Sequence, residues 1–213
     1  LTIPARDGVP LQARLYKPAG FDPTRRYPLI LYLYGEPNAP TVVDAWRSWP
    51  PGNVLYEQLL LRMGYLVATV DPRSATGATK AMENTVLKQV SGDVETSDLV
   101  DGVRWLKAQA WVDPERVGVW GWSGGGTYTL LALTRTQEFK AGISVAPVTE
   151  RRYYDTKYVE PYMKTPQENP EGYDDVSLVK RAQHLHGRLL LVHGTYDDNV
   201  HTQNSWHFAD ELV

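Results

Sequence analysis

Strand-length apolar runs alternate along the chain with segments of helical periodicity, and this alternation limits the fold more than any other feature. The run Leu29–Tyr34 is nearly all apolar, which is typical of a strand covered on both faces in a parallel sheet. Apolar residues at helical spacing predict an amphipathic helix over Asp93–Gln109. Strands that alternate with helices favour an α/β fold, with a mostly parallel sheet flanked by helices. Further strands are predicted at Leu11–Lys17, Tyr65–Val70 and Val117–Trp122, and short buried strands at Ile143–Ala146 and Leu189–Val192. Further helices are predicted at Leu55–Met63 and Gly125–Thr134.

One domain accounts for residues 1–213, a length that can bury a sizeable core. The 22 basic and 25 acidic residues leave a net charge of −3, which favours neither nucleic acid nor an anionic membrane as a partner. No apolar run approaches the length of a membrane span. The lack of cysteine excludes disulfides, thiolate metal sites and a cysteine nucleophile.

The stretch between Thr149 and Arg181 is rich in tyrosine, proline and charge and has no clear periodicity. We therefore expect loops and short helices there. In α/β proteins such excursions lie above the sheet, where sites are found.

The segment Gly121-Trp-Ser-Gly-Gly125 matches the pattern G-x-S-x-G between a predicted strand and a predicted helix. That context indicates a nucleophile elbow, a tight strained turn that presents the Ser123 hydroxyl at the start of a helix. Glycine at 121 and 125 removes side chains that would collide in such a turn. The alternative is a glycine-rich phosphate loop, but Gly126-Thr-Tyr128 lacks the lysine that a Walker loop needs.

A carboxylate follows the last predicted strand, where this kind of fold places the acid of a catalytic triad. Asp197 is the preferred candidate and Asp198 the alternative. Either aspartate could instead belong to a solvated turn or cap a helix predicted to begin at Val200.

The sequence offers no suitable base for the triad. His184 and His186 precede the acid and flank a predicted surface turn, and His193 ends the strand, where a partly buried, hydrogen-bonded imidazole is expected. His201 and His207 lie on the helix predicted after the acid, whereas the fold places the base beyond that helix and one further strand. We therefore expect that the last strand, the last helix and the triad histidine lie outside these residues, and that residues 1–213 alone are inactive. A metal site is the alternative use of these side chains, but no H-E-x-x-H spacing occurs.

From about Leu29 onward the chain resembles the catalytic domain of the prolyl oligopeptidase family of serine peptidases, most closely the dipeptidyl peptidase IV-like branch. The resemblance is carried by four ordered motifs: Tyr34-Gly-Glu-Pro37, Gly121-Trp-Ser-Gly-Gly125, Ala146-Pro-Val-Thr149 with Tyr153-Tyr-Asp-Thr-Lys-Tyr158, and Leu191-Val-His-Gly-Thr-Tyr-Asp-Asp-Asn-Val-His201. It implies an α/β-hydrolase fold and hydrolysis of peptide bonds through an acyl-enzyme.

The resemblance also implies roles for individual residues. Ser123 corresponds to the nucleophile and Asp197 to the triad acid. Tyr34 resembles the family tyrosine that supplies one oxyanion donor, and the backbone N–H of Gly124 supplies the other. Without the resemblance, Tyr34 would be interpreted as an aromatic residue packed at a strand end. The pocket for the residue before the scissile bond, typically proline or alanine, would be lined by Val148, Tyr154, Tyr158, Asn199 and Val200.

The sequence departs from the family in three respects. Position 124 usually carries a bulky aromatic wall of the pocket, so glycine suggests a roomier or rearranged pocket. The segment Asp71-Pro-Arg-Ser-Ala-Thr-Gly77 keeps the family's Asp and Arg but loses its central glycine, and we expect those two residues to be structural. Family members also carry an N-terminal β-propeller, which residues 1–213 do not encode.

The resemblance implies a peptide substrate, no cofactor and no metal. It further implies a homodimer, as in relatives, and favours a periplasmic or secreted location. A carboxylesterase of the same fold and a non-catalytic binding domain on a hydrolase scaffold are the alternative functions.

Overall fold

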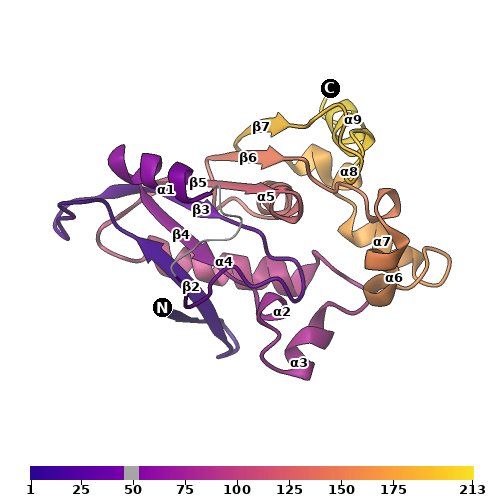
Figure 1. Ribbon diagram of the computed structural model, residues 1–213, viewed down its shortest axis with the longest axis horizontal. Coiled ribbons are helices and arrows are strands. Elements are labelled where there is room, and N and C mark those ends of the chain that lie inside the picture. The colour runs from indigo at the N-terminus through magenta and orange to yellow at the C-terminus, as the bar shows by residue number, and fades with distance from the viewer. Residues whose placement is uncertain (46–52) are drawn as a thin grey trace.

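A mixed β-sheet forms the centre of the molecule in the computed structural model, which describes residues 1–45 and 53–213 (Figure 1). Among these residues the sheet has seven strands in the order β1-β2-β4-β3-β5-β6-β7. The strands β4, β3, β5, β6 and β7 are mutually parallel, whereas β1 and β2 are antiparallel to their neighbours. The strands are β1 (Thr2–Pro4), β2 (Pro10–Tyr16), β3 (Tyr27–Tyr32), β4 (Leu66–Val70), β5 (Val112–Trp122), β6 (Ala141–Val145) and β7 (Arg188–Val192).

Helices connect the parallel strands, as the sequence predicts. The longer ones are α1 (Asn53–Arg62), α4 (Asp93–Lys107) and α5 (Gly124–Arg135). The shorter ones are α2 (Arg73–Thr76), α3 (Lys80–Glu83), α6 (Thr156–Met163), α7 (Pro170–Val176), α8 (Leu178–Arg181) and α9 (Gln203–Asp210), with 3₁₀ turns at η1 (Asn84–Val86), η2 (Arg151–Tyr153) and η3 (Ala182–His184). No helix in the described part of the chain is both long enough and apolar enough to cross a bilayer.

The core lies between the sheet and the helices α4 and α5. All five residues of β4 are buried, and Leu29 and Leu31 of β3 are fully buried. Helix α5 is buried on nearly every side, because it packs against both β5 and β6. Burial of so much apolar surface is the main force that holds the sheet and helices together.

The excursion after β6 forms loops and short helices, as expected. Figure 1 shows α6 and α7 beyond the carboxyl ends of β6 and β7, with α8 nearby. Because the carboxyl ends of all the parallel strands lie at this side of the sheet, residues that follow β3, β5, β6 and β7 can meet there.

Two expectations are wrong in detail. Strand β7 is not buried, since Leu190 and Val192 are 56% and 43% exposed, and β7 has no neighbour beyond it among the described residues. Helix α9 begins at Gln203 rather than Val200, so His201 precedes the helix instead of lying on it. Neither aspartate at 197 and 198 caps α9, because Thr202 occupies its N-cap position.

Candidate active site

Ser123 lies in a strained turn between β5 and α5. Its φ and ψ angles are 57° and −119°, in a region that non-glycine residues rarely adopt. Its backbone N–H donates to the carbonyl oxygen of Val145 at 2.8 Å, which ties the turn to the end of β6. Within the described residues no side chain hydrogen-bonds to the Ser123 hydroxyl. The predicted elbow geometry is therefore present, with the serine at the N-terminus of a twelve-residue helix.

The glycines on either side of Ser123 are required by space. A Cβ on Gly121 would lie 2.4 Å from the carbonyl oxygen of Gly125. A Cβ on Gly125 would lie 2.0 Å from the carbonyl oxygen of Leu33. Both contacts are with backbone atoms, which cannot rotate away as a side chain could, so any larger residue would open the turn.

A pocket of about 120 Å³ opens beside the serine. It joins the loop after β3, the start of α5, the loop after β6 and the beginning of α6. Six residues assigned to the site from the sequence line this pocket: Tyr34, Ser123, Gly124, Val148, Tyr154 and Tyr158.

Tyr34 lines this pocket from the loop after β3. Burial, the Glu36 carboxylate and the nearby Tyr154 raise the pKa of its hydroxyl above the ordinary value of 10.0. The phenol therefore keeps its proton at neutral pH. Together with the backbone N–H of Gly124 at the start of α5, it offers two donors on the wall that Ser123 shares.

The aspartate after β7 is held by its own loop. One oxygen of Asp197, Oδ1, accepts from the backbone N–H groups of Asn199 at 3.1 Å and Val200 at 2.9 Å. This arrangement fixes the carboxylate while Oδ2 keeps lone pairs for another donor. Asp198 is exposed and makes no such contact.

His193 is the partly buried, hydrogen-bonded imidazole that the sequence predicts. Its Nε2 lies 2.7 Å from the carbonyl oxygen of Val200 and its Nδ1 lies 2.7 Å from the Ser205 hydroxyl. A carbonyl can only accept, so Nε2 carries the proton. Nε2 is also 3.6 Å from Asp197 Oδ2, but both ring nitrogens are already occupied.

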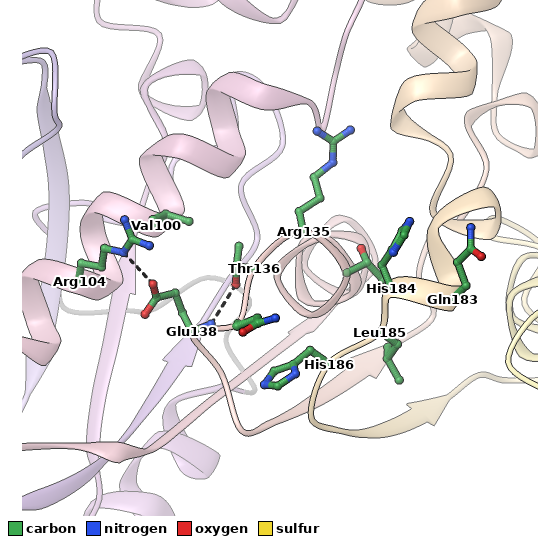
Figure 2. Close-up of a pocket in the computed structure, with 11 residues that line it drawn as sticks. Val100, Arg104, Arg135, Thr136, Glu138, Gln183, His184, Leu185 and His186 are labelled. Carbon is green, nitrogen blue, oxygen red and sulfur yellow. Dashed lines mark hydrogen bonds and ion pairs between the residues drawn. The ribbon is translucent and has the colours of Figure 1, made fainter.

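The remaining histidines lie away from the pocket. His201 and His207 are exposed, and the His207 ring stacks edge-on against Tyr153. His184 and His186 line a separate hollow of about 810 Å³ at the ends of α4 and α5 (Figure 2).

That hollow contains neither the serine nor the aspartate of the candidate site. Arg104 donates to Glu138 there at 2.7 Å, while the guanidinium of Arg135 points away from the other labelled side chains in Figure 2. Within the described part of the chain, no three His, Asp or Glu side chains gather as a metal site.

Of the substrate-pocket residues assigned from the sequence, Val148, Tyr154 and Tyr158 line the pocket, whereas Asn199 and Val200 do not. Val148 is held by Thr127, which bonds to its backbone N–H and carbonyl at 2.9 Å each. Tyr154 donates to Asn199 Oδ1 at 3.2 Å, which connects the pocket to the aspartate loop. Val200 is buried and does not line the pocket.

Comparison with known proteins agrees with this geometry. Residues 54–213 match the family described as the prolyl oligopeptidase family. The chain belongs to the prolyl oligopeptidase family. A protein named "Probable dipeptidyl-aminopeptidase B" from Paracoccidioides lutzii is 39% identical over 97% of this chain, and its namesake from Emericella nidulans is 38% identical. The chain spans 22% of the length of each of these relatives.

The solved structure of Porphyromonas gingivalis dipeptidyl peptidase 4 matches the whole chain with a TM-score of 0.92 and 38% identity, and the match covers 29% of that protein. The fold is therefore the α/β-hydrolase fold of this family, as the sequence predicts.

The Asp71 and Arg73 side chains that the chain shares with the family have structural contacts. Asp71 accepts from the Thr41 hydroxyl at 2.6 Å and from two backbone N–H groups. Arg73 bonds to the fully buried Asp98 and also to Asp7. Neither residue lines the pocket beside Ser123.

Sequence reasoning missed two residues of the site. Glu36 and Arg151 both line the pocket, are at least nine-tenths buried, and form an ion pair at 3.0 Å. Glu36 lies within the motif Tyr34-Gly-Glu-Pro37, and its place in that motif is the one feature of the sequence that could have assigned it to the site. Arg151 had none, because its position beside Glu36 depends on how loops 115 residues apart pack together.

Proposed function

We propose that the protein is a serine peptidase that removes dipeptides from the amino end of peptides, with proline or alanine before the scissile bond. One observation carries this proposal: the Ser123 hydroxyl, held in a strained turn at a helix N-terminus, opens into a pocket that also holds Tyr34 and Gly124. The names of the relatives favour a dipeptidyl aminopeptidase over a carboxylesterase of the same fold.

The chemistry is acyl transfer. The Ser123 oxygen attacks the peptide carbonyl carbon while its proton passes to a histidine. The Tyr34 hydroxyl and the Gly124 N–H stabilise the oxyanion that forms. As the intermediate collapses, the C–N bond breaks and the imidazolium returns the proton to the leaving amine. Water then hydrolyses the acyl-enzyme by the same steps, and Asp197 stabilises the imidazolium each time.

The triad histidine belongs to this proposal and lies outside residues 1–213. None of the five histidines here is both close to the pocket and unoccupied. β7 is an edge strand of the described sheet, which leaves its backbone available to a further strand that would lead to the base. Leu190 and Val192 are exposed on one face of β7, which supports a further helix packed on that face.

The test compares peptide and ester substrates with the complete protein. A dipeptidyl anilide should be hydrolysed much faster than a simple ester of similar size. Ser123→Ala should lower kcat by about 10⁶-fold, and Ser97→Ala, a half-buried serine on α4, should not change it. An ester preference in the native protein would favour the carboxylesterase instead.

Two further expectations are tested with the same material. Residues 1–213 alone should be inactive, and hydrolysis by them would assign the base to one of their own histidines. The homodimer implied by the resemblance is checked by light scattering of the complete protein.

A further inference from the structure

The side chain of Glu36 fills the space that a residue larger than glycine would need at position 124. A Cβ on Gly124 would lie 2.3 Å from Glu36 Cγ and 2.9 Å from its Oε1. The glycine therefore does not enlarge the pocket, contrary to one reading of the sequence. A carboxylate side chain from the loop after β3 stands there instead.

The Glu36 carboxylate is fixed from two sides. Arg151 Nη2 donates to Oε1 at 3.0 Å, and the Tyr158 hydroxyl donates a short hydrogen bond to Oε2. Burial and the Glu36 charge raise the pKa of Tyr158, so the phenol remains the donor. The geometry makes Glu36 a rigid part of the pocket rather than a mobile surface carboxylate.

Arg151 is held from behind by a second buried group. Its Nη2 also donates to the Ser91 hydroxyl at 2.5 Å, and the Ser91 backbone N–H donates to Glu95. Its Nε and Nη1 groups make no hydrogen bond within residues 1–45 and 53–213. Since Arg151 lines the pocket, water in the pocket is the natural acceptor for those groups.

The pocket lining is consequently mixed in polarity. Val148 and the rings of Tyr154 and Tyr158 are its apolar part, and Glu36 with Arg151 is its ionic part. A proline ring would displace water from the ion pair without replacing its hydrogen bonds, which is costly. A methyl or hydroxymethyl group leaves room for that water.

We propose that the Glu36–Arg151 pair determines specificity, so that the residue before the scissile bond is alanine or serine in preference to proline. The inference rests on the proposed peptidase function and revises the residue expected before the scissile bond: serine joins alanine, and proline becomes the poorer substrate. Glu36 and Arg151 act here through the shape and polarity of the pocket, not through the reacting atoms.

The experiment measures kcat/KM of the complete protein for Ala-Ala, Ala-Ser and Ala-Pro p-nitroanilides. The native protein should cleave the first two at least about tenfold faster than the third. The double variant Glu36→Met with Arg151→Met replaces the pair by apolar side chains of similar length, an exchange that buried ion pairs often tolerate. It should raise the Pro-to-Ala ratio of kcat/KM by about tenfold or more.

A matched control is available in the Arg14–Glu57 pair, which also has an N–O distance of 3.0 Å and a buried glutamate, but lies on β2 and α1. The same double exchange to methionine there should leave the ratio unchanged. Circular dichroism and the melting temperature report whether each variant folds.

The outcomes separate the two proposals. Absence of hydrolysis of all three anilides by the native protein would reject the peptidase function itself. Hydrolysis with proline equal to or better than alanine would overturn the specificity inference while leaving the function intact, and that comparison needs no variant. A folded Glu36→Met/Arg151→Met variant with an unchanged ratio would overturn it as well.

Discussion

The carbonyl oxygen of Leu33, just after β3, occupies the place where a Cβ on Gly125 would fall, 2.0 Å away. Two segments 92 positions apart in sequence thus meet backbone to backbone beneath the serine. The elbow is held by this contact as much as by its own turn, because the strained angles of Ser123 persist only while the surrounding structure fixes them.

Gly125→Ala should therefore destabilise the protein. The added methyl must displace backbone of β5, α5 or the loop after β3, at a cost of about 1–3 kcal/mol or more. Chemical denaturation of the complete protein would measure this cost. Gly194→Ala is the matched control, since nothing lies within 4 Å of its Cβ position. Equal stability of the two variants would contradict the packing argument.

Tyr34→Phe should lower kcat by about 10²–10³-fold with little change in KM, because it removes one oxyanion donor. Because burial and the Glu36 charge raise the pKa of Tyr34 above its ordinary value, its phenol stays protonated around neutral pH, and the native enzyme should show no loss of kcat from its ionisation between about pH 7 and pH 8. Steady-state kinetics across pH check both points. An unchanged kcat in the phenylalanine variant would remove Tyr34 from the mechanism.

Asp197→Asn should lower kcat by about 10⁴-fold, because the amide cannot stabilise an imidazolium as the carboxylate does. The loop should remain intact, since the amide oxygen can still accept from the backbone N–H groups of Asn199 and Val200. The neighbouring Asp198→Asn serves as the control and should retain activity. If Asp198→Asn proved the more damaging of the two, the assignment of the acid would pass to Asp198.

Gly124 and Glu36 should be energetically coupled. Gly124→Ala alone places a methyl against Glu36 Cγ, whereas in Glu36→Ala that space is vacant. Glu36→Ala has its own cost, because Arg151 loses its counter-charge, so only the full double-mutant cycle isolates the contact. A coupling energy of about 0.5–3 kcal/mol is expected. Gly124→Ala combined with Glu57→Ala, a remote carboxylate, should be additive.

Arg73→Met should reduce the free energy of unfolding by about 3–5 kcal/mol, because the fully buried Asp98 loses its guanidinium counter-charge and keeps only the backbone N–H of residue 73. KM and kcat should change little in the folded fraction, as Arg73 does not line the pocket. Arg6→Ala offers a control, since the exposed Arg6–Asp101 pair should contribute about 1 kcal/mol or less. A large kinetic effect of Arg73→Met with unchanged stability would contradict a structural role.

Much of the fold could be predicted from local patterns. The strand Leu66–Val70 and the helix Asp93–Lys107 lie within two residues of their predicted bounds, because apolar runs and helical periodicity report directly on local backbone geometry. The predicted start of α9 at Val200 is wrong, and the reason is also local. Asp197 accepts hydrogen bonds from the backbone N–H groups of Asn199 and Val200, and these bonds hold both residues in the loop before the helix.

The sequence by itself determined the parallel sheet, the strand–turn–helix around Ser123 and the need for small residues at 121 and 125. Each of these follows from residues close together in the chain. The tertiary structure alone decided that Glu36 stands in the place of a side chain on residue 124 and that Arg151 neutralises it. Those facts depend on contacts between distant segments, and such contacts are set by how strands and loops pack rather than by any periodic pattern along the sequence.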